Sequence, residues 1–381
     1  MVYVPSISSA LAIVTVLASA AQAATCVVSN SGNVANNIVS AFSNCKNGGT
    51  VVFSKGTTYN LNDLVTVQGL NGVNVQFYGT LNLPAYSSKF KNQSAYLIIK
   101  GQKIKFDGGN TGVINGNGQQ WWDAKDKSAP TVLRITATGG STFSNFKILQ
   151  APRAHIGVTS SSDVIIDKIT LNTVSKSSND AHNTDGIDIS NSKNITWSNS
   201  VVRNGDDCMA INGNTSNVKV NNVQCTGSHG FSVGSLGKGG ENDVVSGIVV
   251  TNSKCTDCQN GLRIKTWPGG KGSVSNVQFS GVQLNNVDNP ILITTHYCDN
   301  NQMSYCKGND NASLTIKDVQ IKSISGSASS AGKPVLSINC SKNTPCSGFS
   351  VSGINVTKNS KTKKNECINL NGANSISYCS Q

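Results

Sequence analysis

The chain has 381 residues, a formal net charge of +12, 13% charged residues and 37 glycines. This length accommodates one large core or two domains, and ample hydrophobic residues at low charge density exclude a disordered or low-complexity chain. Glu241 and Glu366 are the only glutamates, so chemistry that needs paired carboxylates must use aspartate. The positive charge favours an acidic partner, namely nucleic acid, a membrane surface or an anionic polysaccharide, although a basic isoelectric point is also a solubility property.

The N-terminus carries the pattern of a secretory signal peptide. A mostly apolar run extends from Ala10 to Ala20, and Ala21-Gln22-Ala23 after it has the small residues of a cleavage site. We expect residues 1–23 to be removed, although no Lys or Arg precedes the run; the alternative is an N-terminal core strand. The run is shorter than the ~18 residues of a membrane span, so we expect a secreted protein that does not bind membranes.

The twelve cysteines agree with secretion, because an even number in an exported chain indicates disulfides. Their order suggests five sequential local bridges: Cys26–Cys45, Cys208–Cys225, Cys298–Cys306, Cys340–Cys346 and Cys367–Cys379. Cys255 and Cys258 are ambiguous, since a C-x-x-C pair can be a tight bridge, a redox motif or half of a zinc site. Without a second such pair, and with four histidines in the chain, zinc is disfavoured.

Sequons for N-glycosylation occur at six positions: Asn92, Asn194, Asn214, Asn311, Asn339 and Asn355. In a eukaryotic secretory pathway some of them would carry glycans. Chance sequons also arise in a chain this rich in Asn, Ser and Thr, and the one at Asn339 has Cys in its middle position.

Short β-type runs with alternating polarity recur along the chain, separated by polar turns. They begin at five positions, namely Asp163, Asn194, Asn217, Ser246 and Ser275, at intervals of 31, 23, 29 and 29 residues. Strong helix formers are scarce, and a period of 20–50 residues in β-forming sequence indicates a solenoid, whose units bury their apolar faces by stacking. A β-propeller needs about 40–45 residues per blade, so a single right-handed parallel β-helix over residues 24–381 fits better.

Two segments depart from this pattern. Within residues 33–44, apolar residues recur at helical spacing, which predicts a short amphipathic helix. Such a helix would cap the open N-terminal end of the solenoid, where core and strand edge are otherwise exposed. We expect the Lys-rich residues 358–364 to form a solvated loop.

Residues that carry chemistry recur on successive units. Asp206 and Asp207 follow Asp185 by 21 and 22 residues, and His229 follows Asp206 by 23 residues. Each interval is about one coil, so we expect these side chains to stack on one face of the solenoid. In the next unit, Arg263-Ile-Lys places two cations at the period of a strand, so both side chains point to the same face.

This combination suits the cleavage of an acidic polysaccharide. Glycosidic hydrolysis needs one carboxylic acid that protonates the leaving oxygen and another carboxylate that attacks or activates water. Three crowded aspartates cannot all ionise freely, so at least one pKa should rise to supply the acid, while ionised neighbours supply the base. Arg263 and Lys265 would bind carboxylates of the substrate.

Other aspartates of the solenoid have a simpler explanation. We interpret Asp163, Asp167 and Asp188 as structural residues of the turns. The adjacent pair Asp206-Asp207 has an alternative too, because hard oxygen ligands also suit Ca²⁺.

The motifs resemble those of the polygalacturonase family of pectin-degrading glycoside hydrolases. Four occur in the family's order and spacing: Asn183-Thr184-Asp185, Gly205-Asp206-Asp207-Cys208, Gly227-Ser228-His229-Gly230 and Arg263-Ile264-Lys265. Residues 116–123, with the pattern G-x-G-x-x-W-W-D, resemble the family's N-terminal coil, and the similarity covers essentially the whole mature chain. The resemblance implies a right-handed parallel β-helix that hydrolyses α-1,4-linked galacturonate with inversion, and it implies no metal and no cofactor.

The resemblance also implies a role for each motif residue. Asp206 is similar to the general acid, Asp185 and Asp207 to the pair that activates water, and His229 to the partner that maintains the proton state of Asp206. The residues implied to bind substrate are Arg263, Lys265 and Tyr297. The bridge Cys208–Cys225 would lie beneath this site.

The mode of action is indicated by finer features. Fungal endo-acting members usually have Gln before the Asp pair and Gly-Gly-His, where this chain has Gly205 and Ser228. The segments that begin at Gly227 and Arg263, and the cysteine pair 298–306, resemble fungal exo-acting members instead. Against this, Cys-Met-Ala-Ile-Asn from Cys208 resembles fungal endo forms, some motifs also occur in plant endo forms, and the chain is short for an exo form. We favour exo action, with endo action as the alternative.

Two other classes of function compete with this interpretation. A pectate lyase also combines a β-helix with a basic site, but it eliminates rather than hydrolyses and normally needs Ca²⁺. A non-catalytic solenoid would only bind an acidic glycan or nucleic acid. We expect no nucleic-acid partner, because no aromatic platform is interleaved with the basic residues and the chain is expected to be secreted. We also expect a monomer.

Overall fold

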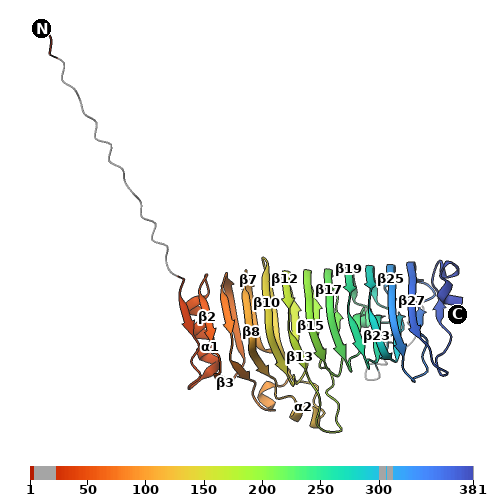
Figure 1. Ribbon diagram of the computed structural model, residues 1–381, viewed down its shortest axis with the longest axis horizontal. Helices are drawn as coiled ribbons and strands as arrows, with labels where there is room; N and C mark the ends of the chain where they lie inside the picture. Colours follow the sequence, from red (N-terminus) through yellow and green to blue (C-terminus); the bar gives the residue numbers. More distant parts are fainter. Residues whose placement is uncertain (4–22, 300–305, 307–311, 381) are drawn as a thin grey trace.

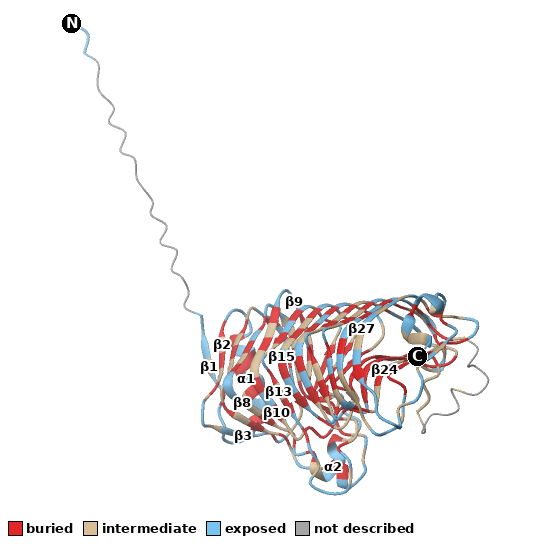
Figure 2. Cartoon of the chain, turned by 45° about the vertical axis from the view of Figure 1, so that its right-hand side comes forward, coloured by how far each residue is buried: buried red, intermediate tan, exposed pale blue. Residues whose placement is uncertain are grey.

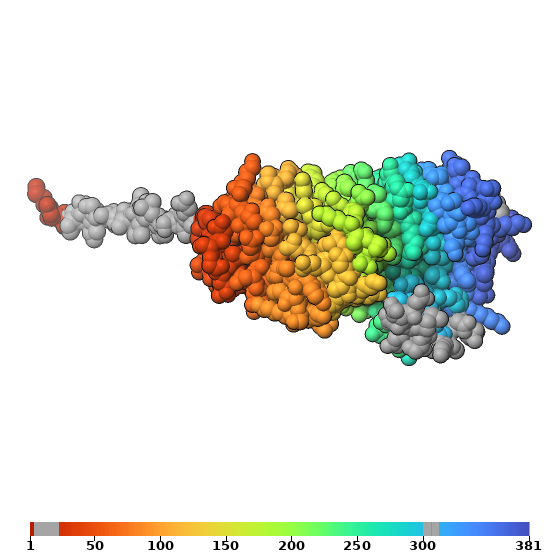
Figure 3. All heavy atoms as spheres, turned by 90° about the horizontal axis from the view of Figure 1, so that it is seen from below, coloured from red at the N-terminus to blue at the C-terminus, as the bar shows by residue number. Residues whose placement is uncertain are grey.

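The computed structural model describes residues 1–3, 23–299, 306 and 312–380, and from Thr25 onward the described residues form a parallel β-helix (Figure 1). The coils stack in chain order along the long axis of the molecule (Figure 3). Strands of successive coils pair in parallel, and the five predicted runs fall on five strands of one sheet that pair from coil to coil. The solenoid predicted from the repeat is therefore confirmed.

Two parallel sheets form the walls of the β-helix in the described residues. The 17-stranded sheet contains β1 (Thr25–Val27), β2 (Thr50–Phe53), β3 (Thr58–Asn60), β5 (Asn74–Phe77), β6 (Thr80–Asn82), β8 (Lys105–Asn115), β10 (Ser141–Leu149), β12 (Ser162–Asp167), β13 (Thr170–Asn172), β15 (Lys193–Arg203), β17 (Thr215–Thr226), β19 (Asn242–Thr251), β20 (Lys254–Thr256), β22 (Lys271–Ser280), β23 (Gln283–Val287), β25 (Thr315–Ala328) and β27 (Ser347–Thr357). The 11-stranded sheet contains β4 (Val65–Asn71), β7 (Ala95–Gln102), β9 (Thr131–Thr138), β11 (Ile156–Thr159), β14 (Ile187–Ser190), β16 (Met209–Ile211), β18 (Phe231–Leu236), β21 (Asn260–Thr266), β24 (Asn289–Thr294), β26 (Leu336–Asn339) and β28 (Glu366–Ile368).

Helices are short and peripheral. The α-helices are α1 (Val34–Cys45) and α2 (Gln119–Asp123), and the 3-10 helices are η1 (Ser88–Phe90), η2 (Lys238–Gly240), η4 (Ala373–Ser375) and η5 (Ser377–Ser380). Helix α1 lies at the N-terminal end of the solenoid, as predicted, and α2 protrudes from its side (Figure 1). The side chain of Asn33 caps α1 by accepting a hydrogen bond from the Asn36 amide at 3.0 Å, and the apolar face of α1, including Ile38 and Phe42, is buried.

The inner face of the 11-stranded sheet carries a ladder of β-branched side chains, one from each coil. In register they are Ile135, Val158, Ile189, Ile211, Val233, Ile264, Ile293 and Ile338, all fully buried. Burial of each such side chain contributes ~1.5–3 kcal/mol. Figure 2 shows buried residues in bands that cross neighbouring strands. A shift of one residue would turn this ladder outward, so the apolar pattern determines the register.

The residues one position earlier form an outer row, because successive side chains of a strand point to opposite faces. In register this outer row consists of Arg134, Gly157, Asp188, Ala210, Ser232 and Arg263. The coil register thus brings Arg134, Asp188, Ser232 and Arg263, which lie far apart in the sequence, onto one outer surface.

Asparagines with left-handed backbone inside strands of the 17-stranded sheet explain much of the unusual composition. Asn194 and Asn217 adopt left-handed backbone with φ of 56° and 55°. Asn217 Nδ2 donates to Asn194 Oδ1 at 3.2 Å, and Asn194 Nδ2 donates to Asp163 Oδ1 at 2.9 Å. Asp167 accepts hydrogen bonds from the next coil in the same way. The interpretation of Asp163 and Asp167 as structural residues is therefore confirmed.

All twelve cysteines form disulfides. The five sequential pairs are those suggested by their order, and Cys255–Cys258 closes as a bridge, which resolves its ambiguity in favour of the first alternative. The segment 358–364 has no strand or helix, in agreement with the loop prediction.

The predicted processing sites fall on different parts of the structure. Residues 4–22 of the predicted signal peptide lie outside the described residues, as does the sequon at Asn311. The sequons on exposed residues are Asn92, Asn194, Asn214 and Asn355, whereas Asn339 is partly buried. Within the described ranges, no helix has the length and apolar character required to traverse a membrane.

Candidate active site

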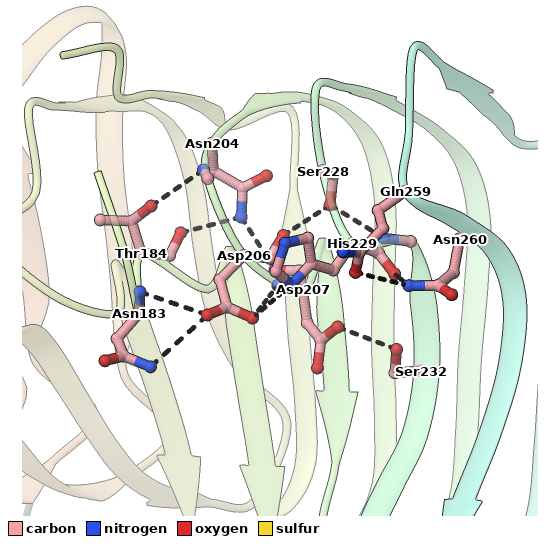
Figure 4. A network of polar contacts seen from close by, with 12 residues as sticks. Asn183, Thr184, Asn204, Asp206, Asp207, Ser228, His229, Ser232, Gln259 and Asn260 are labelled. Carbon is pink, nitrogen blue, oxygen red and sulfur yellow. Dashed lines mark hydrogen bonds and ion pairs between the residues drawn. The ribbon is translucent and has the colours of Figure 1, made fainter. Parts of the chain in front are cut away.

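The predicted site residues lie at the start of consecutive strands of the 11-stranded sheet. Asp185 immediately precedes the Gly186–Ile187 entry to β14, Asp206 precedes β16 and His229 precedes β18. Because these strands pair in register, the three residues stack across adjacent coils. Figure 4 shows the carboxylate of Asp206 beside Asn183 and the imidazole of His229 next to it. Residues that are one coil apart in the sequence therefore lie next to one another, as predicted.

Asp206 is held by hydrogen bonds from three sides. Its Oδ1 lies 3.1 Å from His229 Nδ1 and accepts the Asp207 amide at 2.8 Å, and its Oδ2 accepts the Asn183 amide at 3.2 Å. Burial alone would raise the pKa of Asp206. The hydrogen bond and charge of His229, with a further contribution from Lys265, outweigh burial and lower this pKa to about 2.

Asp207 is buried and forms two ion pairs with side chains of β21. Arg263 Nη2 donates to Oδ1, and Lys265 Nζ donates to Oδ2 at 2.7 Å. Ser232 Oγ donates to Oδ1 at 3.0 Å and accepts from Arg263 Nε at 3.0 Å. Arg263 and Lys265 thus share one face, as their spacing predicts, but in this structure both cations are engaged by Asp207.

Asp185 and Asp188 carry the raised pKa values. Burial first, and then the charges of neighbouring aspartates, raise the pKa of Asp185 well above its ordinary value. Burial and the charges of Asp207 and Asp206 raise the pKa of Asp188 to about 7, against the attraction of Arg153. The sequence-based expectation that at least one carboxyl pKa rises is confirmed, whereas the interpretation of Asp188 as structural is wrong. Asp188 is a residue of strand β14 and lines the cavity together with the predicted site residues, so it is not a structural turn residue.

The loops that carry the aspartates are tied to one another. Asn204 Nδ2 donates to the carbonyls of Thr184 and Asp207 at 2.8 and 2.9 Å, and Ser228 Oγ donates to the carbonyl of Asp206 at 2.8 Å. Gly230 has φ of 92°, and a Cβ there would lie 2.1 Å from the Asn260 carbonyl oxygen. A side chain at this position would therefore push apart the coils that carry His229 and Asn260.

His155 is a part of the site that sequence reasoning missed. It is fully buried, and its Nδ1 lies 2.9 Å from the carbonyl oxygen of Asp185 while its Nε2 lies 2.8 Å from Thr173 Oγ1. Since Thr173 Oγ1 accepts the Ala151 amide at 2.9 Å, its hydroxyl proton is free to donate to Nε2. Burial lowers the pKa of His155 to about 4, so it is neutral and donates through Nδ1 to Asp185. A lone His outside the motifs offered no signal.

The predicted catalytic and substrate-binding residues line one cavity of about 600 Å³. Residues of its lining include Lys127, Arg153, His182, Asn183, Asp185, Asp188, Asp206, Asp207, Ala210, Asn212, His229, Gln259, Arg263, Lys265, Tyr297 and Asp299. Tyr297 packs edge-on against Trp267, with ring centroids 5.0 Å apart, and Lys265 Nζ lies 5.1 Å from the centre of its ring. The bridge Cys208–Cys225 is buried and adjoins Asp207 in the chain, as the resemblance implies. Every predicted catalytic and substrate-binding residue therefore reaches the same cavity.

A metal ion fits this site poorly. Asp206, Asp207 and His229 each place one ligand atom within 4.8 Å of the others. Both carboxylate oxygens of Asp207, however, already accept from Arg263 and Lys265, so a cation would have to compete with two fixed positive charges.

Comparison with known proteins agrees with the fold and the site described above. The model of the family described as glycosyl hydrolases family 28 matches residues 44–379. Exopolygalacturonase rpg16 of Rhizopus delemar is 49% identical over 93% of this chain and 92% of its own length, and exopolygalacturonase rpg13 of the same organism is 50% identical over 95% and 93%. Among solved structures, the endo-xylogalacturonan hydrolase from Aspergillus tubingensis superimposes with a TM-score of 0.84 at 30% identity, covering 92% of this chain and 97% of that one.

Proposed function

The chain belongs to family 28 of the glycosyl hydrolases, and on this premise we propose that it is an exo-acting polygalacturonase that releases galacturonic acid from the ends of α-1,4-linked polygalacturonate, with inversion. The observation that carries the proposal is the meeting of Asp185, Asp188, Asp206 and Asp207 with the cation pair Arg263 and Lys265 in one cavity. The acids suit glycosidic cleavage, and the cations suit a substrate that bears carboxylates.

In this proposal Asp206 is the general acid. Its low pKa means that it is charged in the free enzyme, so it must gain a proton before it can protonate the leaving oxygen. Lys265 is one of the groups that lower this pKa. When the carboxylate of a substrate binds Lys265 and displaces water from the cavity, both changes raise the pKa of Asp206 and favour its acidic form.

Asp185 then serves as a base together with Asp207. In the free enzyme the raised pKa of Asp185 favours its protonated form, while the neighbouring Asp206 is charged. Since strongly interacting carboxyls titrate together, substrate binding shifts this proton toward Asp206 and leaves Asp185 charged for activation of water. His229 regulates the exchange through its hydrogen bond to Asp206.

Arg263, Lys265 and Tyr297 are the proposed substrate contacts. Asp207 occupies only part of the donors of the two cations, because guanidinium has five N–H groups and ammonium has three. The remaining donors are available to a uronate carboxylate, and Tyr297 forms the adjoining wall of the cavity.

Exo action rests on the two Rhizopus delemar relatives, which carry that name at 49% and 50% identity. A local feature agrees with it. At Gly205, where endo-acting relatives usually have Gln, a Cβ would lie 2.5 Å from the Ala181 carbonyl oxygen. Gly205 therefore packs directly against this segment, and the adjacent His182 lines the cavity.

We also propose that residues 1–23 are a cleaved signal peptide and that residues 24–381 act as a single secreted, monomeric domain on pectin. Six disulfides support an oxidising destination. Mass spectrometry of the N-terminus of the secreted protein tests the cleavage site after Ala23.

Product analysis over time on polygalacturonate tests the activity. We expect galacturonic acid alone from the earliest points, slow loss of viscosity, and the β-anomer first in proton NMR spectra. A ladder of oligomers with rapid loss of viscosity would instead establish endo action. Unsaturated products that absorb in the ultraviolet and disappear with a chelator would establish a lyase, and binding without cleavage would refute an enzyme of either kind.

A further inference from the structure

Three cations lie on the opposite side of the aspartates from Arg263 and Lys265. Lys127 and Arg153 are exposed and line the cavity, and Arg134 lies beneath them on β9. Among the described residues, neither Lys127 nor Arg153 has an ion pair, and Arg134 Nε is buried without a hydrogen-bond partner. We call Lys127, Arg134 and Arg153 the basic cluster.

The outer row shows where Arg134 of this cluster lies relative to Arg263. Arg134 and Arg263 lie in the same register row, with Asp188 between them. At the usual strand spacing, Arg134 is two strands or ~10 Å from Asp188, and Arg263 is three strands or ~14 Å from it. Gly157 and Ala210 flank Asp188 with little or no side chain, and a Cβ at Gly157 would meet only one atom within 4 Å, at 3.8 Å. The outer row therefore has no bulky side chain directly on either side of Asp188.

Charge balance distinguishes the two sides of the cavity. Arg263 and Lys265 are both paired with Asp207, whereas the basic cluster faces Asp188 alone. Burial and the charge of Arg153 lower the pKa of Arg134, as happens when like charges lie close together without an anion between them. With a pKa of about 7, Asp188 supplies at neutral pH only about half a negative charge against three positive charges. This side of the cavity therefore carries an excess of positive charge.

On the basis of the proposed function, we propose that the basic cluster is a second uronate subsite, which binds the carboxylate of the galacturonosyl unit across the scissile linkage from the unit held by Arg263 and Lys265. Guanidinium groups suit bidentate contact with a carboxylate, and Lys127 adds a point charge. Both units that adjoin the cleaved linkage then require a free carboxylate, so a methyl ester on either of them weakens binding.

The double variant Lys127→Gln/Arg153→Gln tests this subsite, because both side chains are exposed and their loss leaves the core intact. On digalacturonate at low ionic strength we expect KM to rise at least about tenfold, the effect of losing a charge-assisted carboxylate contact. We expect a much smaller change in kcat, because the contact is the same in ground and transition states. In the wild type, a methyl ester on the unit bound by the cluster raises KM similarly, and in the double variant that ester adds no further penalty.

The matched control is Lys193→Gln/Lys219→Gln, which removes the same charge from exposed positions on β15 and β17 of the other sheet. A KM for the cluster variant equal to that of the control, or an ester penalty that persists in the cluster variant, refutes the subsite while leaving the proposed function intact. Failure of the wild type to release galacturonic acid from digalacturonate or polygalacturonate refutes the proposed function, and the subsite with it.

Discussion

The imidazole Nδ1 of His229 lies 3.1 Å from Oδ1 of Asp206, although the two residues are 23 positions apart in the chain. The contact exists because one coil of the β-helix separates them, so the strands that follow them pair in register. The same contact places a donor and a charge against the carboxylate that we propose as the general acid.

Replacement of His229 by Ala should raise the pKa of Asp206 from about 2 toward its ordinary value. A carboxyl whose pKa is lowered by folding contributes stability above its unfolded pKa, and that contribution disappears as the pH falls through the folded pKa. The wild type should therefore be more stable than His229→Ala at pH 6, and the difference should shrink between about pH 4 and pH 2. Denaturant unfolding across this range measures it, and a difference independent of pH would contradict the assigned cause.

Replacement of Asp206 by Asn should lower kcat by about 10²–10⁴-fold, the contribution of general acid catalysis. The folded structure should survive, because the amide oxygen can take the place of Oδ1 and still accept the Asp207 amide. Steady-state rates on polygalacturonate and thermal unfolding check both parts. Asp163→Asn, an equivalent change at an exposed position of β12, is the control and should retain wild-type activity. A folded Asp206→Asn enzyme at full activity would overturn the assignment of the acid.

Replacement of Asp188 by Asn should change how stability depends on pH. Because folding raises the pKa of Asp188 to about 7, the folded state binds more protons than the unfolded state between about pH 4 and 7. This group therefore makes the wild type lose stability as the pH rises through that interval. Asp188→Asn should flatten the profile and gain relative stability of about 1 kcal/mol or more at pH 8. Parallel profiles of unfolding free energy against pH for the wild type and the variant would show that folding does not raise the pKa of Asp188.

Replacement of Thr173 by Val should destabilise the fold by about 1–3 kcal/mol, because the buried His155 Nε2 loses a donor and the Ala151 amide loses an acceptor. The effect should appear in the free energy of unfolding. Thr173→Ser retains the hydroxyl and serves as the matched control, with a much smaller loss. A Thr173→Val protein as stable as the wild type would mean that the hydrogen-bond chain to Asp185 does not support the site.

Much of the fold was predictable because a solenoid is built from local pattern. The alternation of apolar and polar residues determines which side chains enter the core, and the recurrence of similar runs at 23 to 31 residues indicates coils that stack. Helix α1 was predictable for the same reason, since the spacing of Ile38 and Phe42 is a local property.

The sequence by itself determined which residues meet: the one-coil spacing of Asp185, Asp206 and His229, and the two-residue spacing of Arg263 and Lys265, place them in one cavity. Only the tertiary structure decided their electrostatic states and partners. Asp207 engages both cations, protons favour Asp185 and Asp188 over Asp206, and His155 supports Asp185 from another coil. The physical reason is that register follows from the periodicity of each strand, whereas burial and charge at a site depend on side chains from several coils at once. At the site, the cations thereby fall into two groups: Arg263 and Lys265, which are paired with Asp207, and the basic cluster, in which neither Lys127 nor Arg153 has an ion pair among the described residues.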